Sequence, residues 1–133
     1  MQGAEQLRID AAAALFDCFA RAFATFDSAN VAELFAVPTV GLRKDGSIIA
    51  LSNREDVVRY YQAALDSYNH AACRTARWLD LETHPMGAHA FLATVSWELL
   101  RDDGSVALRW RQSYCLNYQG DRPKIFASAM HGE

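Results

Sequence analysis

Large apolar residues recur at intervals of three and four near the start of the chain. Phe16, Phe19, Phe23 and Phe26 lie in an alanine-rich run over residues 10–26 that contains neither glycine nor proline. This spacing puts the aromatic side chains on one face of an α-helix. Residues 10–26 are therefore predicted to form an amphipathic first helix.

Two further helices follow from capping signals. Asp27 or Ser28 can cap a short second helix, because both side chains accept hydrogen bonds from the free backbone N–H groups at a helix start. Pro38 closes that helix, since the residue before a proline avoids helical dihedral angles. The spacing Ser52–Glu55 matches a capping box, so a third helix is predicted from there to about Asn69.

The remaining segments are typical of β-strands. Residues 39–44 and 47–51 flank Asp45-Gly46 and predict a hairpin with a two-residue turn. From residue 73 to residue 130, β-branched, aromatic and leucine residues cluster in segments separated by turn residues, which predicts four more strands. Strands of about fourteen residues exceed the usual length and normally coil.

The fold class expected from this order is a single α+β domain over residues 1–133. A cone-shaped, curled antiparallel sheet of about six strands wraps over three helices that come mainly from the N-terminal side. The concave side of such a sheet, covered by the aromatic stripe of the first helix, is the natural place for a small apolar pocket.

The middle hairpin permits a register prediction. A two-residue loop at Asp103-Gly104 would pair residues so that one face is apolar and the other is charged, whereas a three-residue loop would lose these matches. The predicted pairs are Trp97 with Trp110, Leu99 with Leu108 and Ala93 with Tyr114 on one face, and Glu98 with Arg109 on the other. The same reasoning, extended to the preceding strand, places Ala76, Trp78 and Asp80 on the face of Trp97, unless a bulge intervenes.

Composition and charge narrow the classes of function. The chain of 133 residues carries 13 Lys and Arg against 16 Asp and Glu, without a basic run, so we expect no nucleic-acid partner. No apolar stretch is long enough to cross a membrane and the N-terminus lacks a signal-peptide pattern, so a cytoplasmic protein without membrane contact is expected. The 3 cysteines and 4 histidines have no ligand spacing, so neither a metal nor a cofactor is expected.

The order of elements resembles the nuclear transport factor 2-like superfamily, with its SnoaL-like polyketide cyclase and ketosteroid isomerase branches. The resemblance rests on Trp97 followed by the turn at 101–104, on Tyr114 in the next strand, and on Gly120 before a final strand at 124–128. Pro123 replaces the tryptophan usual at the start of that last strand. The resemblance implies a homodimer and a function that ranges from isomerase, dehydratase or cyclase to simple binding.

The candidate site residues are those predicted to face the cone. Asp80 and Tyr114 are candidate catalytic residues, because a carboxylate in an apolar site can act as a general base and a buried phenol can donate to a developing oxyanion. The alternative, that Asp80 points to solvent and Tyr114 only packs, stays open. The candidate ligand-binding residues are Phe16, Phe19, Tyr61, Trp78, Trp97, Trp110 and Gln112.

Three functions are compatible with this pattern. The first is a small-molecule-binding domain for a hydrophobic ligand, the second an acid/base isomerase, dehydratase or cyclase acting on a small hydrophobic carbonyl compound, and the third a non-catalytic dimerisation module. The outer face of the sheet is predicted to form the homodimer, because it mixes apolar residues with paired charges. This face contains Leu92, Thr94, Leu100, Ala107, Ser113 and Cys115 together with Glu98, Arg109 and Arg111.

Overall fold

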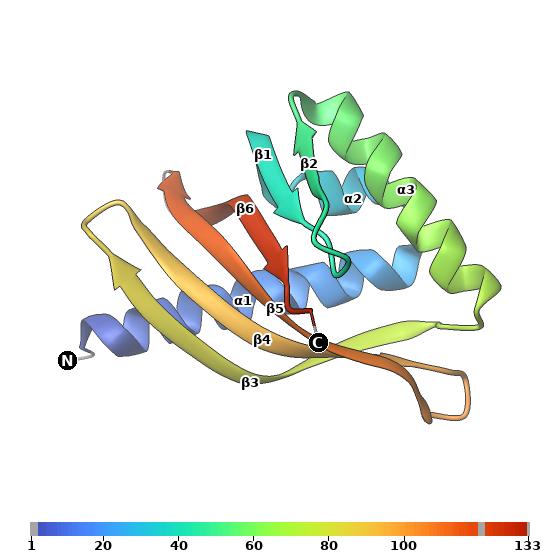
Figure 1. The fold of residues 1–133 in the computed structure, drawn as a ribbon. Helices are drawn as coiled ribbons and strands as arrows, with labels where there is room; N and C mark the ends of the chain where they lie inside the picture. The colour runs from blue at the N-terminus through green and yellow to red at the C-terminus, as the bar shows by residue number, and fades with distance from the viewer. Residues whose placement is uncertain (1–2, 120–121, 133) are drawn as a thin grey trace.

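The computed structural model describes residues 3–119 and 122–132. Two helices precede a hairpin, a third helix follows it, and four long strands complete the chain (Figure 1). Gly120, which contributed to the family resemblance, lies outside the described residues. The elements are α1 (Ala4–Thr25), α2 (Ser28–Ala32), β1 (Phe35–Leu42), β2 (Ile48–Leu51), α3 (Arg54–His70), β3 (Thr75–Met86), β4 (Ala90–Leu100), β5 (Val106–Gln119) and β6 (Arg122–Met130).

The strands form one curled, unclosed sheet in the order β2-β1-β6-β5-β4-β3. This confirms the α+β class and the six strands, but the sheet is mixed and not wholly antiparallel, because β1 pairs with β6 in parallel. The pairing between β1 and β6 is irregular between Phe35 and Val40, and Pro38, which cannot donate a hydrogen bond, lies in that interval. In Figure 1, α1 runs along one face of the long strands, while α3 lies beside the β1–β2 hairpin.

The predicted register between β4 and β5 is confirmed. Trp97 pairs with Trp110, and the other three predicted pairs also occur. The turn, however, has three residues and not two, because Arg101 N donates to Ser105 O at 2.9 Å around residues 102–104. The extra loop residue is compensated by a bulge at Ala107, since Leu100 pairs with Val106 while Leu99 pairs with Leu108.

Both hairpins with an Asp-Gly-Ser sequence use the same turn. In the first, Arg43 N donates to Ser47 O at 2.8 Å, so its loop also has three residues and the two-residue prediction was wrong there too. The aspartates of both turns accept from the serine two residues later, which lowers the pKa of Asp45 and of Asp103. A three-residue loop requires a left-handed residue in third place, and glycine supplies it.

The start of α3 differs slightly from the predicted capping box. Asn53 is the N-cap and its side chain accepts from Asp56 N, while Ser52 N donates to the Asp56 carboxylate. The reciprocal arrangement is therefore shifted by one residue along the chain. Asp27 caps α2, as one of the two alternatives predicted. The prediction that Pro38 closes this helix was wrong, because α2 ends at Ala32 and Pro38 lies within β1.

The inner face of the sheet packs on α1 through aromatic rings. Phe16, which is fully buried, lies with its ring centroid 5.0 Å from Tyr114, 6.0 Å from Trp97 and 6.4 Å from Trp78. The predicted direction of the Trp97 face, toward the helices, is thus confirmed. Aromatic pairs at these distances add to the stabilisation that comes from burying their apolar surface.

The outer face holds one buried charge. Glu98, expected to be exposed, has no exposed surface because the side chains of Arg77 and Arg109 cover it. Arg77 Nε lies 2.6 Å from Glu98 Oε1, and this hydrogen bond, followed by that of Arg109, lowers the pKa of the carboxyl. A carboxylate on this face is tolerated because two guanidinium groups replace the water it loses.

The shared turn generates a prediction about stability. Gly46 and Gly104 have φ angles of +90° and +84°, and an added Cβ would meet nothing within 4 Å, so the cost of alanine is conformational alone. Gly46→Ala and Gly104→Ala should each lower the free energy of unfolding by about 1 kcal/mol. Urea denaturation measures this, with Asp102→Ala in the same loop as the control, because it loses only an exposed ion pair. Equal effects of Gly104→Ala and Asp102→Ala would contradict the explanation.

Candidate functional site

A partly open cavity of about 100 Å³ lies between the inner face of the sheet and helices α1, α2 and α3. Its lining is mainly aromatic and aliphatic. From the helices it is lined by Phe19, Phe23, Val31, Tyr60, Tyr61, Ala64, Leu65 and Tyr68. From the sheet and the connections it is lined by Phe35, Thr39, Val40, Gly41, Leu42, Arg43, Ile49, Leu51, Ala76, Trp97, Leu99, Trp110, Gln112, Tyr114, Ser128 and Met130.

Two tryptophans orient the two buried polar side chains of β5. Trp97 Nε1 donates to Tyr114 Oη at 2.7 Å, and Trp110 Nε1 donates to Gln112 Oε1 at 2.8 Å. An indole N–H only donates, so the phenol oxygen and the amide oxygen are both acceptors here. The Tyr114 O–H and the Gln112 NH₂ group therefore remain as hydrogen-bond donors, on residues whose Cα atoms are about 7 Å apart along the strand.

Burial keeps three tyrosines of the cavity, Tyr61, Tyr68 and Tyr114, protonated. Loss of hydration raises the pKa of Tyr61 and of Tyr114 well above the ordinary value of 10.0, and it raises the pKa of Tyr68 by less. The hydrogen bond from Trp97 opposes this effect at Tyr114 without cancelling it. These phenols are accordingly neutral donors and not bases near neutral pH.

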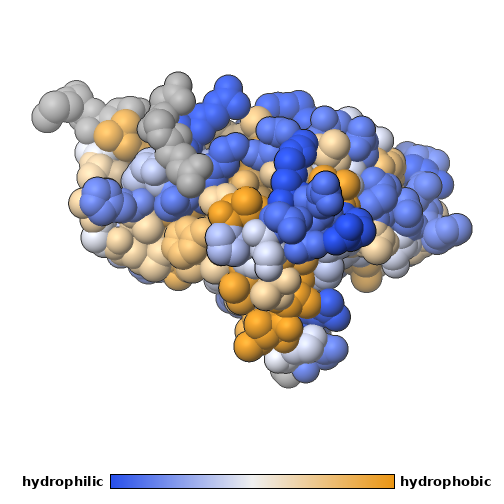
Figure 2. Space-filling model, turned by 90° about the horizontal axis from the view of Figure 1, so that it is seen from above, coloured by the Kyte–Doolittle hydropathy of each residue, from blue (hydrophilic) through white to orange (hydrophobic). Residues whose placement is uncertain are grey.

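The mouth of the cavity lies at β1 and the β1–β2 turn. Val40 and Leu42 line the cavity and yet are 47% and 38% exposed. In Figure 2, hydrophobic residues, drawn in orange, gather on the part of the surface that projects at the bottom of the view. Arg43 is the one charged residue among the described lining residues, and its guanidinium lies 5.5 Å from the Tyr60 ring centroid, within cation–π distance.

The structure brings most of the predicted site residues to this cavity, but not all. Phe16 is buried under Tyr114 and belongs to the core. Trp78 packs on Phe16, and its indole N–H donates to Asp17 Oδ1 at 2.9 Å, outside the cavity. The predicted residues that do line the cavity are Phe19, Tyr61, Trp97, Trp110, Gln112 and Tyr114.

Asp80, the predicted general base, does not lie in the cavity. The pairing of β3 with β4 shifts between Leu79 and Glu82, and Asp80 within this bulge has a φ of +56°. Its side chain is exposed, and its backbone carbonyl accepts a hydrogen bond from Arg111 Nη1 at 3.1 Å. The prediction that Asp80 and Tyr114 lie on the same face of the sheet was therefore wrong. One extra residue in a strand changes the face on which the following side chains lie.

Sequence reasoning missed the cavity residues of β1, its turn and β6. Thr39, Arg43 and Ser128 reach the cavity because β1 joins the sheet beside β6. This pairing is parallel and joins segments that lie far apart in the sequence, so no local periodicity indicates it. Tyr68 also lines the cavity, and its position three residues after Leu65 and seven after Tyr61 on α3 is the helical spacing that indicates this.

The described residues contain no group of three or more His, Cys, Asp or Glu side chains that could hold a metal ion. Within the same residues, no helix is both long and apolar enough to cross a membrane.

Solved structures share this fold. Aln2 from a Streptomyces species superposes with a TM-score of 0.78 at 8% identity, over 98% of this chain and 94% of Aln2. A proposed dehydratase of the NTF2-like family from Streptomyces avermitilis has a TM-score of 0.70 at 13% identity, over 95% and 96%. The association domain of C. elegans CaMKII has a TM-score of 0.70 at 11% identity, over 98% and 99%. At such identities, the likeness establishes the fold alone.

The curled sheet over three helices thus places the molecule in the NTF2-like class of α+β domains. The model of the family described as NTF2-like protein (DUF6841) matches residues 9–133, and the chain belongs to that family. No curated protein sequence matches the chain.

The buried hydrogen bond of Tyr114 generates a second prediction. Tyr114→Phe removes the acceptor of Trp97 Nε1 and leaves a buried donor without a partner, which should lower the free energy of unfolding by about 1–3 kcal/mol. Denaturant unfolding followed by tryptophan fluorescence measures the loss. Tyr118→Phe on the same strand is the matched control, because Tyr118 is 45% exposed, and it should change stability by less than about 0.5 kcal/mol. A similar loss in both variants would contradict this role of the hydrogen bond.

Proposed function

We propose that this domain binds a small apolar molecule that carries a hydrogen-bond acceptor, such as a carbonyl oxygen, in the cavity between the sheet and the helices. The single observation that carries the proposal is the pair of donors, Tyr114 O–H and Gln112 NH₂, each oriented by a tryptophan within an aromatic lining. A buried donor gains most from a ligand that supplies an acceptor, because a donor left without a partner has lost its hydration without compensation.

The volume of the cavity limits the part of the ligand that is buried. A cavity of about 150 Å³ takes a benzene molecule, and this cavity is smaller, at about 100 Å³. The buried part is therefore slightly smaller than a benzene ring, and the rest of a larger ligand would extend through the mouth. A ligand that enters there passes Arg43, which favours a negative or polar group at that end.

The chemistry of the lining favours binding over acid/base catalysis. The described lining residues include neither a carboxylate nor an imidazole, and the exposed position of Asp80 removes the base that an isomerase, dehydratase or cyclase would need. A module that served only dimerisation would be expected to have a filled cone. The cavity therefore supports the binding function over that alternative.

A matched pair of ligands tests this proposal. Cyclopentanone and methylenecyclopentane have nearly the same shape, but only the ketone has an acceptor. Titration followed by two-dimensional NMR should give about fivefold tighter binding of the ketone, in line with one net hydrogen bond. This preference should disappear when both donors are removed, in the variant with Gln112→Met and Tyr114→Phe, and should persist in Ser96→Ala, whose side chain lies on the outer face. Equal affinities of the unmodified protein for the two compounds would refute the role of the donors.

We further propose that the chain forms a homodimer through the outer face of the sheet. Leu92 and Leu100 are both partly exposed on that face. Glu98 is already paired with Arg77 and Arg109 of its own chain, so the apolar residues, and not exchanged ion pairs, would provide the contact. A two-fold axis would place this patch against itself.

The dimer can be tested by light scattering at micromolar concentration. The unmodified chain should have the mass of a dimer, and the variant with Leu92→Glu and Leu100→Glu should have the mass of a monomer with unchanged circular dichroism. Leu7→Glu is the control, because Leu7 is a 54% exposed apolar residue of α1 and should leave the mass unchanged. A monomeric mass of the unmodified chain would rule out the dimer at that concentration.

A further inference from the structure

A second and larger cavity lies on the other side of α1, away from the donors of β5. Its volume is about 470 Å³, which falls within the range of about 300–1,000 Å³ that is usual for small-molecule sites. It is bounded by one face of α1, by the segment between α2 and β1, and by the start of β6. It is lined by Ala11, Ala14, Leu15, Cys18, Glu33, Leu34, Arg122, Pro123 and Lys124.

The wall that α1 contributes to this cavity is apolar, and the short side chains on that face of the helix explain why a cavity is present. Ala11 and Ala14 have short side chains, and they line the cavity together with Leu34 and Pro123. Because the methyl groups of the two alanines do not reach the opposite wall, space remains between the helix and the sheet. An elongated apolar group fits such a wall, since it would replace water along the whole face.

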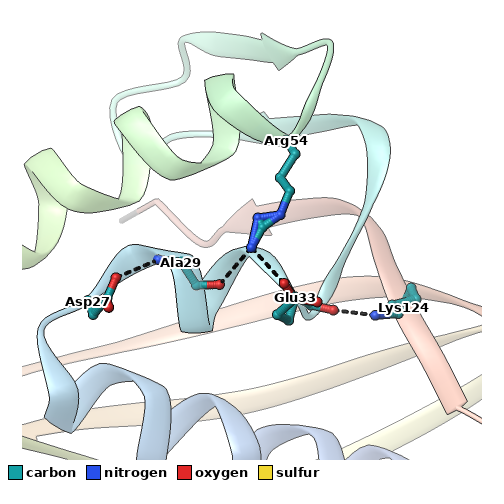
Figure 3. A network of polar contacts seen from close by, with 5 residues as sticks. All are labelled: Asp27, Ala29, Glu33, Arg54 and Lys124. Carbon is teal, nitrogen blue, oxygen red and sulfur yellow. Dashed lines mark hydrogen bonds and ion pairs between the residues drawn. The ribbon is translucent and has the colours of Figure 1, made fainter.

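The charged residues of the described lining come from the connection after α2 and from β6, and not from the apolar wall on α1. Glu33 is the only acidic residue of the described lining, and Arg54 pairs with its carboxylate at 2.6 Å (Figure 3). Lys124 Nζ donates to the backbone carbonyl oxygen of Glu33, which orders the lysine without neutralising its charge. Within the described residues, neither Lys124 nor Arg122 has a carboxylate partner. Among the described residues, the lining is therefore positively charged on balance.

An additional cation belongs to the same face of α1. Arg8 precedes Ala11 by three residues, so it lies one turn earlier on the helix surface that faces the cavity. Its Nε atom is buried and has no hydrogen-bond partner among the described residues. A buried guanidinium nitrogen without a partner is uncommon, and an anionic ligand nearby would reduce its cost.

We infer that this second cavity binds a medium-chain carboxylate. The alkyl chain lies along Ala11, Ala14 and Leu15, and the carboxylate meets Arg122 and Lys124. Arg122 can bind both carboxylate oxygens, whereas Lys124 contributes a point charge. The site is separate from the cavity of Tyr114, so it does not depend on the function proposed above.

Cys18 allows the site to be tested directly. It is a free, partly buried cysteine in the cavity lining, and Arg21 Nη2 donates to its sulfur at 3.2 Å. Cys115 is also free and partly buried, but it lies on the outer face of the sheet and serves as the internal reference. The rate of alkylation of each thiol by iodoacetamide is measured by peptide mass spectrometry with and without octanoate, below the micelle-forming concentration.

Octanoate should slow the alkylation of Cys18 at least fivefold at saturation and leave the rate at Cys115 unchanged. Isothermal titration should give octanoate an affinity about three- to tenfold higher than that of 1-octanol, because exposed ion pairs contribute modestly. The variant with Arg122→Gln and Lys124→Gln should bind the two compounds equally. Ala14→Phe should place a phenyl ring on the wall where the alkyl chain lies and abolish protection by both, whereas Ala24→Phe, on an exposed part of the same helix, should not.

Several results would overturn the inference. Failure of octanoate to protect Cys18 would exclude a ligand at this wall. Equal affinity for octanoate and 1-octanol in the unmodified protein would exclude recognition of the carboxylate. Parallel slowing at Cys18 and Cys115, or protection that survives Ala14→Phe, would show that the compound acts elsewhere. None of these outcomes would affect the cyclopentanone test, so the two proposals fail separately.

Discussion

The register between β4 and β5 is the constraint on which the rest of the structure depends. Alternate residues on these strands have opposite requirements, because Trp97 needs the apolar interior and Glu98 needs the two guanidinium groups outside. A slip of one residue would exchange the two faces and bury a carboxylate against α1. The register that avoids this cost also places Trp97 of β4 where its indole N–H reaches Tyr114 of β5, whereas Trp110 and Gln112 are neighbours on β5 itself.

The cavity owes its chemical character to the same packing. The indole groups donate to Tyr114 Oη and Gln112 Oε1, and this leaves the phenol O–H and the amide NH₂ to donate toward a ligand. Burial reinforces this, because it raises the pKa of Tyr114 and of Tyr61 and keeps both phenols protonated. With Asp80 outside the cavity, the described lining contains donors and no base. Recognition of an acceptor follows from these side chains, whereas proton transfer does not.

The two cavities differ because α1 contributes different residues to each. One face of the helix carries Phe19 and Phe23, which narrow the first cavity to about 100 Å³. The other face carries Ala11 and Ala14, which leave about 470 Å³. Arg54 of α3 and Lys124 of β6 both donate hydrogen bonds to Glu33, at the end of α2. These contacts fix the positions of the charged residues beside the larger cavity. The helix that closes the core on one side thus leaves a groove on the other.

The sequence by itself determined the presence and order of the three helices, the register of β4 with β5, the placement of Trp78 beside Trp97 and most aromatic residues of the cavity. The helix bounds were less exact, because α1 begins at Ala4 and not at residue 10, and α2 ends at Ala32, before Pro38. These features follow from local periodicity and from the opposite needs of adjacent side chains, which can be assessed from neighbouring residues. Only the tertiary structure decided the bulge that turns Asp80 outward, the bulge at Ala107 that restores the register after a longer loop, and the parallel pairing of β1 with β6. A bulge inserts one residue without altering composition, and parallel pairing joins segments that are far apart in the chain, so neither has a local signal.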